Sequence, residues 1–467
     1  MAFDKHIFVG GDEKSTRRSF LSGVVGTGLV ATSGGTVVSP VPPPYPYAAG
    51  DLGGYVPGSQ QSFSLRNGTI LDGDGSKRAG GVRVEAGKIV EIGELKSGDD
   101  LGGAILFPGF FDGGTPVGLW EVDLEATTHD ESESSDAMVP AASVLDAYNA
   151  LSVVIPVARR QGVLGALCTP IGGLVSGQAA WMRFAGDRTS EATMVGSAGL
   201  MVNLGRGGTG GLPNQPKSRM GVMMKLREVL DAHKLPDDPH AGCTEAEKSA
   251  KKCESNLCKK GKASKGEKPP EFTRAQKVWH QVRRRELKLI LAANRADDIL
   301  SGIALAKEYD LDVALMGIAE GHLVAKDIAE AGIPAIVGPI TIQPSGWDSF
   351  HAKYENAAIL HAAGVPLILR AGTPHNLREL PTETVVAVAH GLPYEAAIAA
   401  SCGYNAAKVW KQLPIGSIRV GASATFVVAN GDPIQPRTRM SRAWIAGREV
   451  SLRSRQIDLF ERFRSLW

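Results

Sequence analysis

Apolar and polar residues alternate in two short regions that lie near opposite ends of the chain. In residues 62–94, alternating apolar side chains such as Val82 and Val84 precede a turn at 86–88, and the alternation resumes after it. This pattern predicts a β-hairpin. Residues 416–452 contain short strands of the same kind. We therefore expect one small β-sandwich assembled from both ends of the chain.

The central region has a different pattern, in which short apolar strands are followed by helix-period segments. Helical spacing predicts helices at Ala296–Tyr309 and His322–Glu330. Six or more strand-helix units without a dinucleotide-binding fingerprint favour a parallel barrel. The predicted strands are Ala104–Phe111, Val163–Thr169, Leu287–Ala293, Val313–Met316, Ala335–Val337 and Pro366–Leu369.

Composition agrees with a large barrel and a smaller satellite domain. The chain has 467 residues, of which 43% are hydrophobic and 21% are charged, with a formal net charge of +2. These values are typical of a soluble globular protein, and they give no sign of a nucleic-acid or membrane-surface partner. The 56 glycines fit many short connections and tight turns.

The N-terminal region resembles an export signal. Thr16-Arg17-Arg18-Ser19-Phe20-Leu21 places paired arginines before a short, glycine-rich apolar run that ends in small residues. This order predicts a twin-arginine signal peptide at residues 1–34, a Pro/Gly-rich linker at 35–61, and a periplasmic or other extracytoplasmic destination in a bacterium. A chance Arg-Arg pair is the alternative. The run is shorter than the roughly 20 apolar residues of a spanning helix, so we expect no transmembrane segment.

The segment 237–270 departs from the strand-helix pattern. It carries eight lysines between Lys248 and Lys268, which predicts a solvated insertion or, alternatively, a contact for acidic partners or anionic lipid. Two of its three cysteines, Cys243, Cys253 and Cys258, are able to pair in an oxidising compartment, and a zinc knuckle with His240 is the other interpretation. Cys168 and Cys402 lie in apolar segments, so we expect buried thiols there.

Four stretches together resemble one protein family. They are NGTILDGDG with GVRVEAGKIVEIGE, then ILFPGFFD, then AANRADDILSGIALAKEYDLDVALMGIAEGH, and finally HGLPYEAAIAASCGYNAAKVWKQLPIGSIRVGASATFVVANGDP. Their order is similar to that of the amidohydrolase superfamily, in its imidazolonepropionase-like branch. The resemblance implies an α/β fold with a distorted TIM (β/α)8 barrel at 105–411. It also implies a composite β-sandwich domain at 62–104 plus 412–453.

The resemblance also implies a chemistry, the metal-dependent hydrolysis of C–N bonds other than peptide bonds. Histidines after the first strand and after later strands, with an aspartate after the last, hold divalent ions that activate water in this family. The corresponding positions of this chain are Gly114, Pro116, Asn294 and Gly372, and no two of its ten histidines are spaced i, i+2. We therefore predict no metal ligands and expect no cofactor.

Polar residues near the predicted strand ends are the candidates for a site. Acid, base or weak cation-ligand roles are predicted for Glu121, Asp123 and His129, together with Glu125, and further catalytic roles for His322 and His375. A solvated loop, helix capping or a core role are the alternatives. The predicted substrate-binding residues are Asn294, Arg370, Asn376 and Arg378, with Arg370 suited to a carboxylate or to a neighbouring acid.

Two glycine-rich segments follow the predicted strands. Gly172–Gln178 has the composition of an anion-cradling turn, although a tight barrel loop explains its glycines equally well. Gly205–Gly211 is most simply a flexible lid or a connector.

Three functions are compatible with these observations. The first is an exported, altered or non-catalytic family member that binds a small-molecule ligand without the usual metal. The second is a working hydrolase of cyclic amides or related C–N bonds that uses a rearranged site. The third is a structural or interaction protein that acts through the lysine-rich insertion. The sequence leaves a homo-oligomer open.

Overall fold

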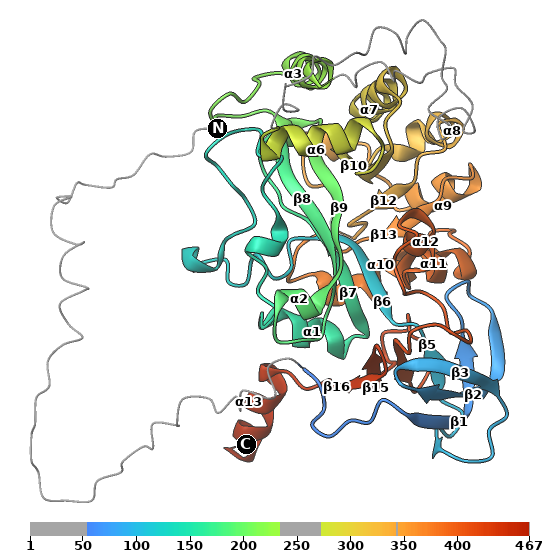
Figure 1. Ribbon diagram of the computed structural model, residues 1–467. Helices are drawn as coiled ribbons and strands as arrows, with labels where there is room; N and C mark the ends of the chain where they lie inside the picture. Colours follow the sequence, from blue (N-terminus) through green and yellow to red (C-terminus); the bar gives the residue numbers. More distant parts are fainter. Residues whose placement is uncertain (1–53, 234–271, 342–343, 467) are drawn as a thin grey trace, which may run out of the picture. The chain divides into compact units, whose positions relative to one another are not determined.

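The computed structural model describes residues 54–233, 272–341 and 344–466, all within one compact unit, Tyr47–Trp467 (Figure 1). The predicted signal peptide, most of the predicted linker and the lysine-rich insertion with its three cysteines lie outside the described residues. Cys168 and Cys402 are buried free thiols, as predicted. No helix in the described ranges is long and apolar enough to cross a membrane.

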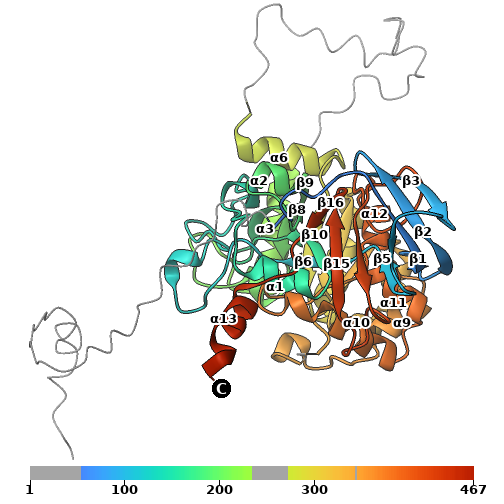
Figure 2. The ribbon, with the colours of Figure 1, turned by 90° about the horizontal axis from the view of Figure 1, so that it is seen from below.

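Segments from both ends of the chain form one sheet. Its strands follow the order β16-β15-β14-β5-β1-β2-β3, and β4 pairs with β1. The junction is the antiparallel pair β5 and β14, where Phe107 lies opposite Val427. Figures 1 and 2 both show the blue N-terminal strands beside the red C-terminal ones. The strands are β1 (Phe63–Leu71), β2 (Lys77–Glu85), β3 (Lys88–Gly93), β4 (Asp99–Asp100), β5 (Ile105–Phe107), β14 (Phe426–Ala429), β15 (Met440–Ile445) and β16 (Arg448–Val450).

The alternation seen in the sequence explains this sheet. Val82 and Val84 are fully buried together with Leu65, Phe426 and Trp444 in a hydrophobic core of its own. Every second side chain of a strand points to the same face, so alternation buries one face. The predicted assembly of the two chain ends is confirmed.

The second sheet is the barrel, in the order β13-β12-β11-β10-β9-β8-β7-β6. Neighbouring strands are parallel except β8, which is antiparallel to both β7 and β9. The strands are β6 (Phe110–Thr115), β7 (Val163–Cys168), β8 (Val175–Arg183), β9 (Thr193–Asn203), β10 (Leu289–Ala293), β11 (Val313–Gly317), β12 (Ala335–Val337) and β13 (Leu367–Leu369). The two end strands, β13 and β6, contact each other, so the barrel is nearly closed.

The two longest barrel strands, β8 and β9, were missed in the sequence. β8 begins inside the glycine-rich segment at 172–178, for which the sequence predicts either an anion-cradling turn or a tight barrel loop. Nearly all of β8 is buried on both faces, so it shows no alternation, and its small residues resemble those of a loop. A hairpin thus replaces one strand-helix unit, which is the distortion of this barrel.

The predicted strand Ala104–Phe111 is in fact two strands in different sheets. β5 ends at Phe107 in the composite sheet, and β6 begins at Phe110 in the barrel. Between them Gly109 has a φ of +79°, and a β-carbon there would lie 2.6 Å from the Leu164 side chain. Pro108 cannot donate a ladder hydrogen bond, so the chain turns from one sheet to the other at this point.

Helices connect most of the parallel strands. α7 occupies the predicted range Ala296–Tyr309, and the residue after it, Asp310, adopts the left-handed conformation. The predicted helix at 322–330 is a short 3-10 turn at Gly321–Leu323 followed by α8 (Ala325–Glu330). The others are α1 (Val154–Arg160), α2 (Thr189–Ala192), α3 (Arg219–Ala232), α6 (Arg274–Arg283), α9 (Asn356–Ala362), α10 (Leu380–Ala389), α11 (Tyr394–Ser401), α12 (Tyr404–Val409) and α13 (Arg455–Phe463).

Candidate functional site at the barrel mouth

A buried carboxylate joins the first and last strands of the barrel. Asp112 in β6 is fully buried, and its two oxygens accept hydrogen bonds from the backbone N–H of Gly114, at 2.8 Å, and of Ala371, at 2.6 Å. Burial raises the pKa of Asp112 to about 6, although both hydrogen bonds and the nearby Arg370 charge act in the opposite direction. We call residues 112–114 of β6, together with residues 370–371 directly after β13, the seam.

Close packing at the seam explains one of its glycines. A β-carbon on Gly113 would lie 2.8 Å from the branched side chains of both Ile336 and Ile368, and 3.0 Å from the carbonyl oxygen of Leu369. These atoms belong to β12 and β13 and cannot move freely. Only a residue without a side chain lets β6 approach the opposite strands this closely.

Gly114 and Asn294 are two of the four positions where the resemblance implies metal ligands. A β-carbon on Gly114 would lie 2.6 Å from the methyl carbon of Met316 and 3.2 Å from its sulfur, so this thioether occupies the adjoining space. The side-chain oxygen of Asn294 lies close to Gly317, because a β-carbon added to Gly317 would be only 2.6 Å from it. Asn294 follows β10 and Gly317 ends β11.

The other two positions provide no side-chain donor. Pro116 lies in a turn in which its carbonyl accepts from Leu119 N, and Gly372 has a φ of +90° beside Pro339. Among the described residues, no group of three or more His, Cys, Asp or Glu side chains is arranged to hold a metal ion. Of the four positions, only Asn294 has a side-chain atom, its amide oxygen, that is able to bind a metal. The four positions therefore do not fit a metal centre of imidazoles and carboxylates.

Several predicted catalytic residues meet in the loops above the seam. The ring of Trp120 lies 5.5 Å from the imidazoles of both His129 and His375. His375 Nε2 lies 3.1 Å from Asp123 Oδ1, although the two residues are 252 positions apart in the chain. His129 Nδ1 lies 3.0 Å from Glu131 Oε1. We call these five residues the imidazole cluster.

Its two histidines differ in their surroundings. The hydrogen bond to the Glu131 carboxylate raises the pKa of His129 above its ordinary value. His129 Nε2 also lies 3.1 Å from the carbonyl oxygen of Val122, which holds the ring against the loop. The His375 side chain and its partner Asp123 are more exposed to solvent, at 39% and 65%. The cluster therefore offers an accessible acid-base pair and a second, more firmly held imidazole.

Other predicted residues near the mouth are engaged locally. Glu121 accepts a hydrogen bond from the Asn149 amide, and Glu125 caps a short 3-10 helix by accepting from Thr127. The backbone N–H of Asn376 donates to Thr373, and Arg378 pairs with its neighbour Glu379 in an exposed ion pair. The catalytic or binding roles of these residues stay predictions.

Arg370 is positioned differently from these surface residues. It follows β13 directly at the seam, where it is half-buried and near Asp112. Its Nε is buried without a hydrogen-bond partner in the described structure, and the same holds for Trp120 Nε1 and Thr115 Oγ1. Three buried donors near the meeting point of β6 and β13 therefore have no acceptor among the residues that the structure describes.

His322 lies outside the imidazole cluster. It lines a separate pocket of about 400 Å³ together with Leu323, His351, Ala352 and Lys353. Both ring nitrogens of His322 are buried without a hydrogen-bond partner among the described residues. Burial, with the Lys353 charge, lowers the pKa of His322, so a neutral imidazole is favoured. The structure thus places His322 apart from His129 and His375, and its catalytic role stays a prediction.

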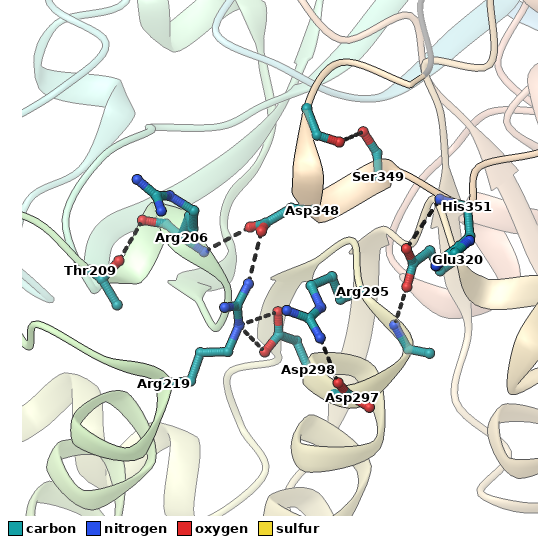
Figure 3. A network of polar contacts seen from close by, with 12 residues as sticks. Arg206, Thr209, Arg219, Arg295, Asp297, Asp298, Glu320, Asp348, Ser349 and His351 are labelled. Carbon is teal, nitrogen blue, oxygen red and sulfur yellow. Dashed lines mark hydrogen bonds and ion pairs between the residues drawn. The ribbon is translucent and has the colours of Figure 1, made fainter.

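A polar network beside the mouth escaped the sequence analysis (Figure 3). Arg219 at the start of α3 donates from Nε to the Asp298 carboxylate at 2.8 and 3.0 Å, and from a terminal nitrogen to Asp348 at 2.8 Å. Asp348 also accepts from the backbone N–H of Arg206 at 2.9 Å. This last bond anchors the segment at 205–211, which forms a short 3-10 helix at Arg206–Gly208. No local pattern relates these residues, because they come from four separate helical elements of the chain.

Glu320 continues this side of the mouth and is buried. Its carboxylate accepts from the backbone N–H of Ala296 at 3.0 Å and of His351 at 3.3 Å, so it ties the start of α7 to the loop after β12 (Figure 3). The network and Glu320 together hold the loop that carries Trp347 to His351 in place.

The whole described fold has solved relatives. An amidohydrolase from Thermotoga maritima aligns with 84% of this chain and 100% of its own, at 26% identity and a TM-score of 0.72. A molinate hydrolase aligns at 19% identity with a TM-score of 0.51, over 84% of this chain and 95% of its own. A prolidase complexed with N-methylphosphonate-L-proline aligns at 16% identity with a TM-score of 0.51, over 83% and 99%.

Comparison of the sequence alone does not find the relatives that comparison of the structure finds. No protein-family model matches the chain, and no curated protein matches it at a significant level. The likeness is thus carried by the nearly closed barrel and the composite second sheet, which the Thermotoga protein matches over its full length. By this fold, the chain belongs to the amidohydrolase superfamily.

Proposed function

We propose that this protein binds a small organic molecule at the barrel mouth and does not assemble the metal centre of its family. The observation that carries the proposal is the donor set at the four expected ligand positions. Two glycines and a proline contribute no side-chain lone pairs, and the Met316 thioether fills the space beside Gly114. Export by the twin-arginine signal is part of the same proposal and rests on the sequence alone.

The unpartnered donors support a ligand with oxygen acceptors. A buried polar group without a partner costs about 1–3 kcal/mol, and a ligand that accepts from Arg370 Nε or Trp120 Nε1 removes that cost. A carboxylate or an amide carbonyl has the required acceptors. Arg370 adds a positive charge, which favours a carboxylate over a neutral amide.

Metal analysis and ligand binding test this proposal together. We expect the purified full chain, produced with zinc, manganese and iron in the medium, to contain far less than one equivalent of metal. We also expect small carboxylates to raise its unfolding temperature, and Arg370→Lys, which keeps the charge but removes Nε, to weaken binding about tenfold. Near-stoichiometric metal that is lost in His322→Ala would contradict the proposal.

The imidazole cluster favours a second candidate, a hydrolase with a rearranged site. The Asp123 carboxylate orients the His375 imidazole at 3.1 Å, which is the arrangement of a general base held by an acid. If this pair is catalytic, His375→Asn lowers the hydrolysis of a cyclic amide about 100-fold while binding is retained. Asp123→Asn serves as the matched variant with the orienting charge removed. Equal activity of the wild type, His375→Asn and Asp123→Asn would exclude a catalytic role for this pair.

The third candidate, an interaction role for the lysine-rich insertion, concerns residues outside the described ranges. It stays a prediction from the sequence. Deletion of residues 237–270, with no change in interactions or localisation, would count against it.

A further inference from the structure

A second pocket lies at the opposite end of the barrel from the mouth. It has a volume of about 440 Å³ and is lined by Arg160, Gln161, Arg437, Thr438, Arg439 and Met440. Arg160 ends α1 just before β7 begins, so this pocket lies at the N-terminal end of a barrel strand. The facing wall is formed by residues of the loop 430–439, which joins β14 to β15 of the composite sheet.

The three arginines of this pocket have no carboxylate partners in the part of the chain that the structure describes. Arg160 makes one long hydrogen bond, from a terminal nitrogen to the Leu452 carbonyl at 3.5 Å. Within the described ranges, no side-chain hydrogen bond or ion pair involves Arg437 or Arg439. By contrast, Arg442, three residues beyond Arg439, pairs with Glu449 and Asp99.

The only acid in the loop is engaged elsewhere. Asp432 lies 4.0 Å from the ammonium group of Lys77 and is hydrogen-bonded to Tyr394. The loop itself is held in shape, because Thr438 N donates to Gln435 O at 2.9 Å. In addition, Asn430 N donates to Arg439 O at 3.1 Å, and Arg439 N donates to the side-chain oxygen of Asn430 at 2.8 Å. Two arginines of this well-connected loop and Arg160 of α1 therefore surround one pocket, and no acidic side chain among the described residues neutralises them.

The number of donors indicates the class of ligand. Each guanidinium carries five N–H donors in a fixed plane, whereas a carboxylate offers only two oxygens. A phosphate group offers three strong acceptor oxygens and up to two negative charges, which three arginines are able to engage together. The Thr438 side chain adds a hydroxyl to the same lining.

We propose that the pocket formed by Arg160, Arg437 and Arg439 is a binding site for a phosphate group. The group belongs either to a soluble phosphorylated small molecule or to the headgroup of an anionic lipid. This site is separate from the barrel mouth, so it does not depend on the function proposed there.

The proposal is tested by calorimetric titration of the full-length protein with inorganic phosphate at constant ionic strength. We expect saturable binding, and about tenfold weaker binding for each arginine removed in Arg437→Gln, Arg439→Gln and the double variant. Arg419→Gln is the matched control, because Arg419 is also exposed and unpaired in the described structure but lies outside the pocket. Unchanged unfolding temperatures without phosphate show that the variants fold.

A parallel arm separates the two sources of phosphate. Vesicles of neutral phosphatidylcholine are compared with vesicles that also contain phosphatidic acid, in a co-sedimentation assay. Binding of soluble phosphate alone identifies a small-molecule ligand, whereas arginine-dependent binding only to the acidic vesicles identifies a lipid headgroup. The proposal is overturned if neither probe binds, or if Arg419→Gln weakens binding as much as the pocket variants do.

Discussion

At the seam, the Asp112 carboxylate is fully buried and receives two backbone N–H groups, whereas in the imidazole cluster Asp123 faces solvent and meets His375 through a single contact. Both carboxylates come from the same stretch of chain after β5. The first holds strands together and the second is accessible to a ligand. Buried residues of the seam therefore stabilise the fold, whereas exposed residues of the imidazole cluster are the ones able to contact a ligand. We call these two sets of residues the packed layer and the exposed layer.

The largest effect is expected from removing the carboxylate of the seam. Asp112→Ala leaves the N–H groups of Gly114 and Ala371 buried without acceptors, so the free energy of unfolding should fall by about 2–4 kcal/mol. Asp123→Ala, in the exposed layer, should change it by less than about 0.5 kcal/mol. Chemical denaturation of the two variants measures both values. Similar losses of unfolding free energy in Asp112→Ala and Asp123→Ala would contradict the distinction between the packed layer and the exposed layer.

A pH profile tests the same carboxylate with its shape preserved. The folded-state pKa of Asp112, about 6, lies above the ordinary aspartate pKa of 3.8, so the folded protein binds the proton more tightly than the unfolded chain. The contribution of Asp112 to stability is therefore fully present below pH 3.8 and is lost as pH rises to about 6, by on the order of 2–3 kcal/mol.

The control for this profile is Asp112→Asn, which does not titrate. The difference in unfolding free energy between wild type and Asp112→Asn should change in this pH window and stay constant above it. A difference that is flat from pH 4 to pH 7 would show that burial does not raise this pKa.

Two adjacent glycines sharpen the comparison within the seam. Gly113→Ala presses a methyl group against branched side chains and the Leu369 carbonyl, so we expect a loss of about 2 kcal/mol. Gly114→Ala meets only the flexible end of Met316, which is able to move, so a loss below about 1 kcal/mol is expected. Thermal unfolding of both variants gives the comparison. A larger loss for Gly114→Ala would mean that Met316 is rigidly held.

The smallest effect concerns two histidines at the mouth. In a titration followed by NMR, the pKa of His129 should lie above the ordinary histidine value and that of His322 below it. The imidazole of His129 is hydrogen-bonded to the Glu131 carboxylate, whereas His322 is buried near the Lys353 charge. Glu131→Gln should lower the pKa of His129 and leave that of His322 unchanged. The opposite order of the two pKa values would contradict the placement of both rings.

Much of the frame was predictable because it depends on local spacing. Helical periodicity placed α7 at its observed bounds, and apolar alternation identified the strands that meet in the composite sheet. The cis Gly338-Pro339 bond and the β8–β9 hairpin were not predicted. A strand that is buried on both faces carries no alternation to distinguish it from a glycine-rich loop.

The sequence by itself determined the alternation of strands and helices and the absence of imidazoles at positions 114 and 116, because both are properties of neighbouring residues. Only the tertiary structure decided that His375 meets Asp123, that Arg219 joins Asp298 to Asp348, and that Arg160 faces Arg437 across a pocket. These partners are separated by 50 to 277 residues in the chain. Near-closure of the barrel and pairing of the two chain ends bring them together, and no periodicity within a short window encodes such contacts.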